Sequence, residues 1–334
     1  MTGRLSAALL GDPIRRIKVY RIIAYGFLAV GFILFLFAGG CFSEESTKIH
    51  VGFSSKMFTD VNDNDVKAAL KVWAQVLFKE RGLPVDPEMI VLNGTGQITH
   101  ALRNKQIDAF AITTDEYWPL EKEIQPSKVV VSDFDGSIYD EYVLLVHRDS
   151  KIQRLADLRG RGLAFLVNPR TSLAPAWLDT LLLKDGLEPF SVFFGHVTEV
   201  SKFPRAILPV FFRQIDACVV TRRGLKTMSE LNPQVGVQLK VIASSPEVVP
   251  AGFFFRPGFS SGIKERMLEE FGNIHKTVAG QQALTIFQSG KLQVQPISVL
   301  NNALQILADH KRLSAGWNSE KKTKPGAGQA KPQQ

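Results

Sequence analysis

Residues 157–186, DLRGRGLAFLVNPRTSLAPAWLDTLLLKDG, decide the fold class of this chain. Behind a Gly-Arg-Gly turn, the apolar run 163–167 has the length of a buried strand. Residues 177–183 then have the length and the apolar spacing of a helix. The residues between the two must form a strand-to-helix turn, so this stretch predicts one unit of an α/β fold.

The turn between this strand and this helix predicts a binding site for an oxyanion. Thr171 or Ser172 is a good N-cap, and Pro175 is tolerated only in a first helical turn, where its missing N–H costs nothing. Unpaired backbone N–H groups and two hydroxyls then face outward at the positive end of a helix, beyond the carboxyl end of a strand. An ordinary capped helix without a ligand is the alternative explanation of the same residues.

The alternation of strands and helices predicts the topology. Strands are predicted at 49–53, 89–92, 107–112, 128–132, 142–147, 163–167, 192–194, 214–220, 239–243 and 253–255, and helices at 65–81, 97–104, 177–183, 201–212, 263–279, 282–289 and 297–310. This order is typical of a mainly parallel, doubly wound sheet. The tetrapeptide Gln-Ile-Asp-Ala occurs at 106–109 and at 214–217, at the same helix-to-strand junction in each half. We therefore expect two lobes that are built on one plan.

Two extended crossings, near 144–147 and near 242–250, are expected to join the lobes into a hinged clamshell. The end of the chain is rich in Lys, Gly, Pro and Gln and has little apolar surface to bury, which is typical of disorder. The predicted division is residues 1–41 for export or anchoring, 48–143 and 247–310 for lobe 1, 144–246 for lobe 2, and 314–334 for a disordered basic tail.

The basic charge of the chain is concentrated at its two ends. The formal net charge is +8. Residues 1–24 carry five basic residues and one acidic residue, and residues 310–334 carry six basic residues and one acidic residue. The rest of the chain therefore has a net charge of −1 and no basic stripe that could follow the phosphates of a nucleic acid. We predict no nucleic-acid partner.

Residues 22–40 carry no charge and follow the N-terminal basic cluster, which predicts export of everything after Cys41. The sequence Ala38-Gly39-Gly40-Cys41 resembles a bacterial lipoprotein signal, in which the Cys is lipidated, although Ala stands where that signal usually has Leu. Three outcomes remain open: a lipoprotein tethered through Cys41, an uncleaved transmembrane anchor, or a secreted protein with a cleaved signal peptide. All three place the body on the periplasmic side of the membrane, and the first two tether it there.

The sequence contains no pattern that indicates an enzyme. The six His residues are scattered and no two have metal-ligand spacing, and neither G-x-S-x-G nor a Cys–His pairing is present. The only other cysteine, Cys218, lies in the apolar run 215–220 and is predicted to be a buried strand thiol. We predict no catalytic residues, no metal and no cofactor.

Polar residues follow the first three predicted strands. Ser54 and Ser55 come directly after the first strand, Thr95 lies in the Gly-Thr-Gly turn after the second, and Thr113 follows the third. The carboxyl ends of parallel strands meet at one edge of a sheet, and ligands of open α/β folds bind there. These four residues are therefore candidate ligand donors of lobe 1.

The order of several short motifs resembles the phosphonate/phosphite-binding proteins of ABC importers, which are extracytoplasmic type II solute-binding proteins. The resemblance covers about residues 48–300 and implies a two-lobed clamshell with two hinge crossings. The matching motifs are Asp149-Ser150, Leu155-Ala156-Asp157-Leu158, Gly160, Ala164-Phe165, Asn168-Pro169-x-Thr171-Ser172, Gln214-x-Asp216-Ala217, and Ser245-Pro246 followed by Pro250.

This resemblance also implies candidate ligand contacts. In that family a Ser/Thr-rich turn at a helix N-terminus holds the phosphorus oxyanion, and Thr171 and Ser172 match its hydroxyl positions. Leu173-Ala174 stands where the family has Ser-Gly, which removes a hydroxyl and a glycine that allows close backbone approach. Tyr139 approximates a ligand-contacting aromatic residue, and Asp216 matches a strand position of the family.

The resemblance implies a solute-binding protein that closes over a small phosphorus-type oxyanion and delivers it to the permease subunits of an ABC importer. The expected partners are the anionic solute, the permease and the membrane, and the chain is expected to be a monomer. The alternative is a sensory ligand-binding protein of the same fold that signals to a membrane partner.

Overall fold

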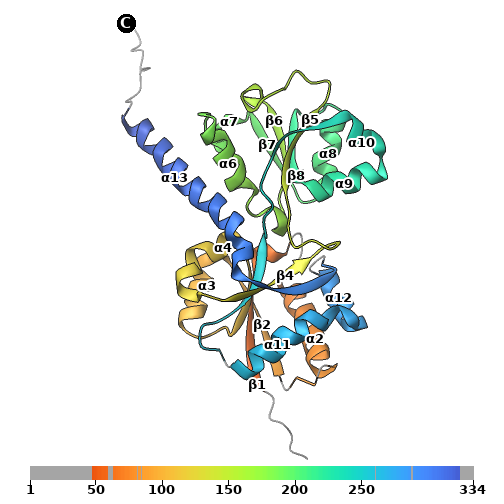
Figure 1. Cartoon of the computed structure of the whole chain (residues 1–334), viewed down its shortest axis with the longest axis vertical. Helices are drawn as coiled ribbons and strands as arrows, with labels where there is room; N and C mark the ends of the chain where they lie inside the picture. Colours follow the sequence, from red (N-terminus) through yellow and green to blue (C-terminus); the bar gives the residue numbers. More distant parts are fainter. Residues whose placement is uncertain are drawn as a thin grey trace, which may run out of the picture. The chain divides into compact units, whose positions relative to one another are not determined.

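The computed structural model describes residues 47–58, 63–80, 82–83, 85–259, 261–286 and 289–323, which form two α/β lobes (Figure 1). The export segment with Cys41 and the last residues, 324–334, lie outside the described residues. Within the described part of the chain, no helix is long and apolar enough to cross a bilayer.

The sheet of lobe 1 has six strands in the order β11-β4-β10-β3-β1-β2. Strand β1 runs parallel to β2 and β3, whereas β10 is antiparallel to β3 and β4, and β11 is antiparallel to β4. Strands β1, β2, β3 and β4 therefore run in one direction, and β10 and β11 run in the other. The sheet is mixed but mainly parallel, as predicted, with two antiparallel strands. A parallel neighbour needs a long crossover, whereas β10 enters the sheet from the second crossing, beside the end of β3. The strands are β1 (Thr47–Ser54), β2 (Val85–Leu92), β3 (Ala109–Thr113), β4 (Lys128–Asp133), β10 (Ala251–Phe255) and β11 (Lys291–Pro296).

The sheet of lobe 2 has five strands in the order β7-β6-β8-β5-β9. Strand β6 is parallel to β7 and β8, and β5 is antiparallel to β8 and β9, so this sheet is mixed as well. The strands are β5 (Tyr142–His147), β6 (Gly162–Leu166), β7 (His196–Val200), β8 (Ala217–Thr221) and β9 (Leu239–Ser244).

Strands β7 and β11, each at one edge of its sheet, were not predicted from the sequence. The strand predicted at 192–194 is wrong, because Phe193 ends the short helix α7 (Phe190–Phe193) and, with Phe194, packs into the lobe 2 core. The actual strand, β7, follows two residues later and is almost entirely exposed. Strand β7 has no buried face and carries no apolar alternation, so the pattern gave no signal there. Strand β11 does alternate, and its Leu292 and Val294 pack against the lobe 1 core.

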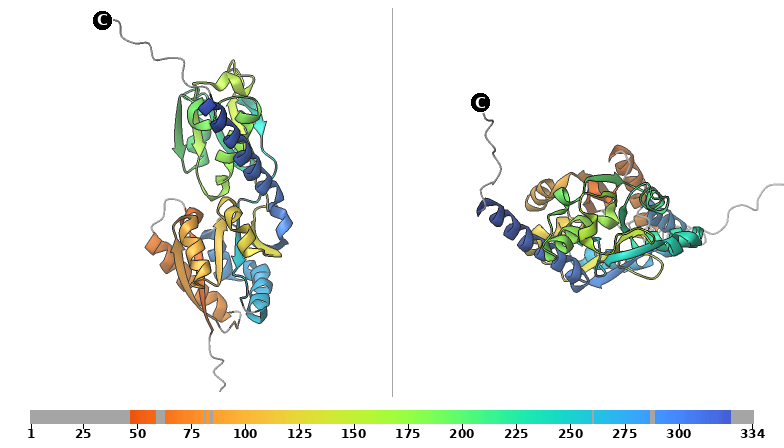
Figure 2. Two further views of the ribbon diagram at one scale, coloured as in Figure 1. Left: turned by 90° about the vertical axis from the view of Figure 1, so that its left-hand side faces the viewer. Right: turned by 90° about the horizontal axis from the view of Figure 1, so that it is seen from above.

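Helices cover both faces of each sheet (Figures 1 and 2). In lobe 1, apolar residues of α2 and α11 pack with β1 on one face, and α3 packs on the other. In lobe 2, α6 and α7 pack on one face, and α8, α9 and α10 on the other. The helices are α2 (Asp63–Glu80), α3 (Gly94–Arg103), α4 (Thr114–Tyr117), α5 (Glu121–Ile124), α6 (Ala174–Lys184), α8 (Phe203–Phe211), α9 (Arg222–Leu231), α10 (Pro233–Gln238), α11 (Ser261–Asn273), α12 (Val278–Ile286) and α13 (Asn301–Thr323).

The long helix α13 contacts both lobes. It lies beside α6 (Figure 2), and Ala303, Ile306 and Leu307 belong to the lobe 2 core. Leu304, on the same helix, packs against the lobe 1 core. The helix extends to Thr323, so the prediction of disorder is wrong for residues 314–323. The composition of that segment hid its helix, which continues from a well-packed N-terminal part.

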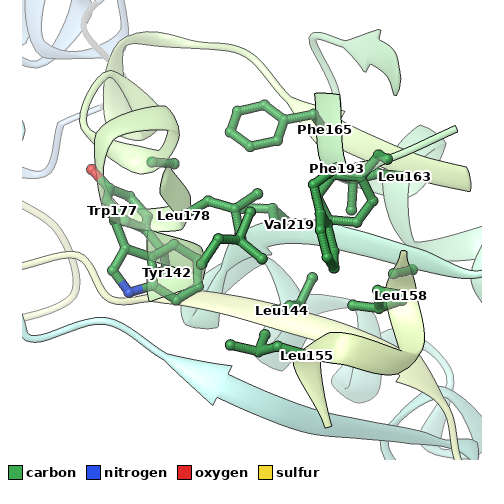
Figure 3. Packing of buried hydrophobic residues seen from close by; sticks show 14 of the residues in the cluster. Tyr142, Leu144, Leu155, Leu158, Leu163, Phe165, Trp177, Leu178, Phe193 and Val219 are labelled. Atoms are coloured by element: carbon green, nitrogen blue, oxygen red, sulfur yellow. The ribbon is translucent and has the colours of Figure 1, made fainter. Parts of the chain in front are cut away.

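Two crossings connect the lobes, at 134–141 and 245–250. They pair with each other, because Asp140 N donates to Val248 O and Val248 N donates to Asp140 O, each at 2.8 Å. The first crossing precedes β5 instead of lying at 144–147 as predicted. Those residues form the buried middle of the lobe 2 sheet, where Tyr142 and Leu144 pack against Trp177 and its neighbours (Figure 3).

The repeated Gln-Ile-Asp-Ala tetrapeptide performs the same structural task in both lobes. Asp108 Oδ2 accepts a hydrogen bond from His50 N at 3.0 Å, and Asp216 Oδ2 accepts one from Gly162 N at 2.9 Å. In each lobe the aspartate precedes a strand, β3 or β8, and its donor lies on the neighbouring parallel strand. Each aspartate thus ties two strands together at their amino ends.

We expect Asp216→Ala to lower the free energy of unfolding by about 1–2 kcal/mol, because Gly162 N loses its charged acceptor. Urea unfolding measures this loss. Affinity for an oxyanion should stay unchanged, because Asp216 lies at the amino end of β8. The exposed Asp185→Ala is a control for the loss of a lobe 2 carboxylate and should change stability by less than about 0.5 kcal/mol. A variant with normal stability and weakened binding would contradict this role.

Candidate ligand-binding site

The carboxyl ends of the parallel strands in both lobes lie beside the second crossing. The carbonyl oxygen of Pro250 accepts hydrogen bonds from Thr114 N of lobe 1, at 2.8 Å, and from Ser172 Oγ of lobe 2, at 3.2 Å. Thr114 follows β3, and Ser172 belongs to the turn after β6. Open α/β sheets bind ligands beyond such strand ends, so we place the candidate site here and call it the interlobe site.

Two of the predicted lobe 1 donors are engaged by a carboxylate of the protein itself. Ser54 Oγ donates to Glu116 Oε1 at 2.8 Å, and Thr113 Oγ1 donates to Glu116 Oε2 at 2.8 Å. The Thr113 N–H also donates to Glu116, which is only 1% exposed. The strand ends do hold an oxyanion, but this oxyanion is Glu116. Thr113 is the N-cap of helix α4, and Glu116 is the third helical residue of its capping box.

In the turn after β6 the predicted donor hydroxyls are also engaged by groups of the protein itself. Thr171 is 2% exposed, and its hydroxyl donates to Leu166 O at 2.7 Å. Ser172 Oγ donates to the crossing at Pro250, as described above. Leu173 and Ala174 are fully buried in the lobe 2 core. The predicted cap by Thr171 or Ser172 is wrong, because the N-cap of α6 is Leu173 and no side chain caps the helix. Both hydroxyls instead donate to backbone carbonyls.

Of the four remaining predicted residues, Ser55 and Thr95 lie at strand ends of the interlobe site, and Tyr139 and Asp216 lie elsewhere. Ser55 and Thr95 are half-buried, and among the described residues neither hydroxyl has a hydrogen-bond partner. They lie on adjacent strand ends, because Ser54 is paired with Leu92 in the β1–β2 register. Tyr139 lies on the first crossing and packs against the lobe 1 core. Asp216 lies at the amino end of β8, opposite the strand ends of the interlobe site, and is not part of that site.

Two arginines that the sequence analysis missed converge on the first crossing. Arg170 Nη1 lies 3.5 Å and Arg223 Nε 3.8 Å from the same oxygen, Asp140 Oδ1. Arg223 Nη1 also donates to Phe134 O at 2.7 Å, and the Arg170 guanidinium lies over the Phe134 ring. Both arginines follow carboxyl ends of lobe 2 strands, β6 and β8, so the strand-end rule applied to cations could have found them.

Burial sets the charge balance of this cluster. Asp140 is 4% exposed, and burial raises its pKa, although Arg170 and Arg223 act to lower it. Burial lowers the pKa of Arg170 to about 10, so the guanidinium stays charged at neutral pH. Arg170 Nη2 and Arg223 Nε are buried without a hydrogen-bond partner among the described residues. Arg223 Nη1 also lies 3.5 Å from Oδ2 of the exposed Asp135. The two cations share one buried carboxylate, and their unpartnered N–H groups remain for a further oxyanion.

Lobe 1 contributes an ion pair at its own strand ends. Lys56 Nζ lies 2.8 Å from Asp115 Oδ2. Burial acts to lower the pKa of Lys56, but the hydrogen bond to Asp115 and the nearby carboxylates raise it overall. The pKa of Tyr142 in lobe 2 is raised well above its usual range by burial and by the charges of Asp140 and Asp115. Asp115 of lobe 1 and Asp140 of the first crossing therefore both act on a tyrosine of lobe 2.

The apolar cavity of lobe 1 does not suit an anion. It has a volume of about 90 Å³ and lies between the sheet and helices α2 and α11. Its walls are almost entirely apolar, as shown by Phe53, Phe78, Met267 and Phe271. An uncompensated charge in such surroundings is strongly disfavoured, so the interlobe site is the better candidate.

Comparison with known proteins agrees with this fold. A family model described as "ABC transporter, phosphonate, periplasmic substrate-binding protein" matches residues 56–298. No curated protein matches the chain in sequence.

Three solved structures illustrate the fold. A binding protein component of an ABC phosphonate transporter from Pseudomonas aeruginosa is 17% identical, with 81% of this chain and 89% of that chain covered and a TM-score of 0.54. A Xanthomonas citri protein bound to ATP is 17% identical, with 81% and 99% covered and a TM-score of 0.58. A Prochlorococcus marinus protein in complex with methylphosphonate is 16% identical, with 80% and 98% covered and a TM-score of 0.54. The predicted two-lobed α/β architecture is confirmed.

We expect Arg170→Met to lower the free energy of unfolding by about 3 kcal/mol at pH 7, because Asp140 loses a counter-charge in a buried site. The substitution raises the pKa of Asp140 further above its unfolded value. Below that unfolded pKa the carboxyl is protonated in both states and needs no partner. The loss should therefore be smallest in acid and grow as the pH rises through the folded-state pKa.

Urea unfolding across this pH range measures the effect. Arg213→Met is the matched control, because the Arg213–Asp149 pair of lobe 2 is exposed, with side-chain exposures of 62% and 66%. It should cost less than about 1 kcal/mol. A loss in Arg170→Met that stays constant with pH would contradict the coupling to Asp140.

Proposed function

Because the chain belongs to the family of periplasmic substrate-binding proteins of phosphonate ABC transporters, we propose that its interlobe site captures a small phosphorus-type oxyanion for import. The observation that carries this proposal is the pair Arg170 and Arg223, whose buried N–H groups lack hydrogen-bond partners among the described residues. The closed, loaded form is presented to the permease subunits. The family match favours import over the sensory alternative, and it describes a component of a transporter and not an enzyme.

The proposed contacts come from both lobes. Arg170 and Arg223 bind from lobe 2, and Ser55, Lys56 and Thr95 bind from lobe 1. A ligand that bridges both sets favours the closed form by the free energy of the contacts that exist only there. Charge-assisted hydrogen bonds contribute about 1.5–3 kcal/mol each, so three or four supply roughly the 8 kcal/mol of a micromolar complex.

The arginines explain how this chain can bind such an anion without the family turn. Thr171 and Ser172 already donate to backbone carbonyls, and Leu173-Ala174 is buried in the core. A guanidinium presents parallel N–H groups that match two oxygens of one phosphoryl or phosphonyl group. We therefore propose that the recognition of the oxyanion has moved from hydroxyls and backbone amides to guanidinium groups.

The family is periplasmic, so the body of this chain lies outside the cytoplasmic membrane. The mode of attachment is a separate proposal. We propose that Cys41 is lipidated and tethers the body to the membrane, because small residues precede it directly after the uncharged segment 22–40. We also propose that the body acts as a monomer.

We expect Arg223→Gln to weaken the binding of methylphosphonate by about 10- to 100-fold, because one charge-assisted donor pair is lost. Isothermal titration calorimetry with methylphosphonate, phosphite and phosphate measures the change and ranks the three anions. Arg222→Gln is the matched control, since this neighbouring arginine is paired with Glu141 and Ser244. Equal affinities in the two variants would place the anion elsewhere. Absence of binding by all three anions to the parent protein would contradict the proposed ligand class.

Lipidation is tested by metabolic labelling with palmitate. We expect Cys41→Ser to lose the label and to remain unprocessed. Cys218→Ser is the control that keeps the label, because Cys218 is fully buried in β8 and burial raises the pKa of its thiol. Label that persists in Cys41→Ser, or a parent chain that carries none, would rule out the lipoprotein.

A further inference from the structure

The sheet of lobe 1 opens at the edge opposite the interlobe site. Strands β4 and β10 pair only through Phe253 and Val130, although β4 begins at Lys128 and β10 ends at Phe255. A groove of about 400 Å³ lies where these two strand ends separate, and residues of α5 and α11 complete it. The proposed function makes no use of this groove.

Three lysines line the groove without an acidic partner. Lys122, Lys128 and Lys264 form no ion pair with any residue that the structure describes. The other charged groups of the lining are neutralised locally. Arg256 Nη2 lies 3.0 Å from Asp108 Oδ1, and Glu123 Oε1 lies 3.1 Å from Arg103 Nε. The groove therefore presents three uncompensated positive charges, which suit an anion with several oxygens.

Part of the groove lining is apolar. The rings of Phe255 and Phe259 are stacked, with centroids 5.8 Å apart, and Lys264 Nζ lies 5.8 Å from the Phe255 centroid. Leu268 and Phe253 also line it. Lysines around phenylalanines match a ligand in which a phosphate is joined to an apolar group. A free inorganic anion would contact only the lysines.

The groove shares its sheet edge with the start of the body. Strand β1 begins at Thr47 at the amino edge of lobe 1, and the end of β10 is aligned with the start of β3 at this same edge. Only five residues, 42–46, separate Cys41 from Thr47. Even a fully extended chain of that length spans at most about 20 Å. A lipid on Cys41 would therefore keep this edge close to the membrane surface.

We propose that the groove between β4 and β10 binds the headgroup of an anionic phospholipid in the membrane that holds the protein. The lysines contact the phosphate, and the phenylalanines receive the glycerol and the first acyl carbons. This inference rests on the tether through Cys41 for its choice of lipid over free phosphate. Binding at the groove would hold the amino edge of the lobe 1 sheet at the membrane surface.

The test uses the full-length chain on nanodiscs of phosphatidylcholine alone and of phosphatidylcholine mixed with phosphatidylglycerol. Hydrogen exchange of residues 122–128 and 255–259 reports on the groove. We expect exchange to slow by about tenfold or more on the anionic discs only. Lys122→Glu, Lys128→Glu and Lys264→Glu together should abolish the slowing, because each lysine near a membrane surface contributes about tenfold or less to binding. The triple variant of exposed lobe 2 lysines, Lys151→Glu, Lys202→Glu and Lys226→Glu, should keep it.

Further measurements make each outcome decisive. Melting temperature and methylphosphonate affinity of the groove variant should equal those of the parent, which shows that the variant is folded. Inorganic phosphate is added to the neutral discs, and equal slowing there would assign the groove to free phosphate and overturn the headgroup. Equal exchange on both types of disc would also overturn the proposal. Retention on neutral discs in size-exclusion chromatography reports the tether separately, so slowing on anionic discs without such retention supports the groove and refutes only the tether.

Discussion

The carbonyl of Pro250 is the point on which the arrangement of the two lobes depends. It accepts one hydrogen bond from the backbone of lobe 1 and one from Ser172 of lobe 2, while the preceding residues of its crossing pair with Asp140. The strand ends of the two sheets are thereby held beside the same short segment. A small anion bound there can contact both lobes, and a change in the crossing moves one set of contacts relative to the other.

Two buried carboxylates decide which donors remain for a ligand. Glu116 accepts hydrogen bonds from Ser54 and Thr113, so the hydroxyl groups of lobe 1 that look most like an anion site are already used. Asp140 is shared by Arg170 and Arg223 and leaves part of their N–H groups without partners. A buried polar group without a partner is costly, so this shortage is itself a driving force for binding an oxyanion.

The hydroxyl groups predicted at the strand ends differ in whether the protein itself already uses them. The sequence predicts ligand donors at the carboxyl ends of strands, and Ser55 and Thr95 do lie there with hydroxyls available. It favours Thr171 and Ser172 because hydroxyls at a helix N-terminus suit an anion. The same preference makes hydroxyls suitable for the backbone carbonyls that they contact here. Asp216 holds two strands of this chain together, which gives its match to a family position a structural explanation.

What the sequence determined by itself is the part that local pattern controls. Alternating apolar runs and helical spacings established two α/β lobes, the repeated Gln-Ile-Asp-Ala junction indicated their common plan, and the motifs over about residues 48–300 indicated the family. Only the tertiary structure decided the direction of β10 and β11, the extent of α13, and the meeting of Arg170, Arg223 and Asp140. These features depend on which distant segments become neighbours. A side chain has the same appearance in the sequence whether its hydrogen-bond partner is a ligand or a residue one hundred positions away, and only the fold supplies that partner.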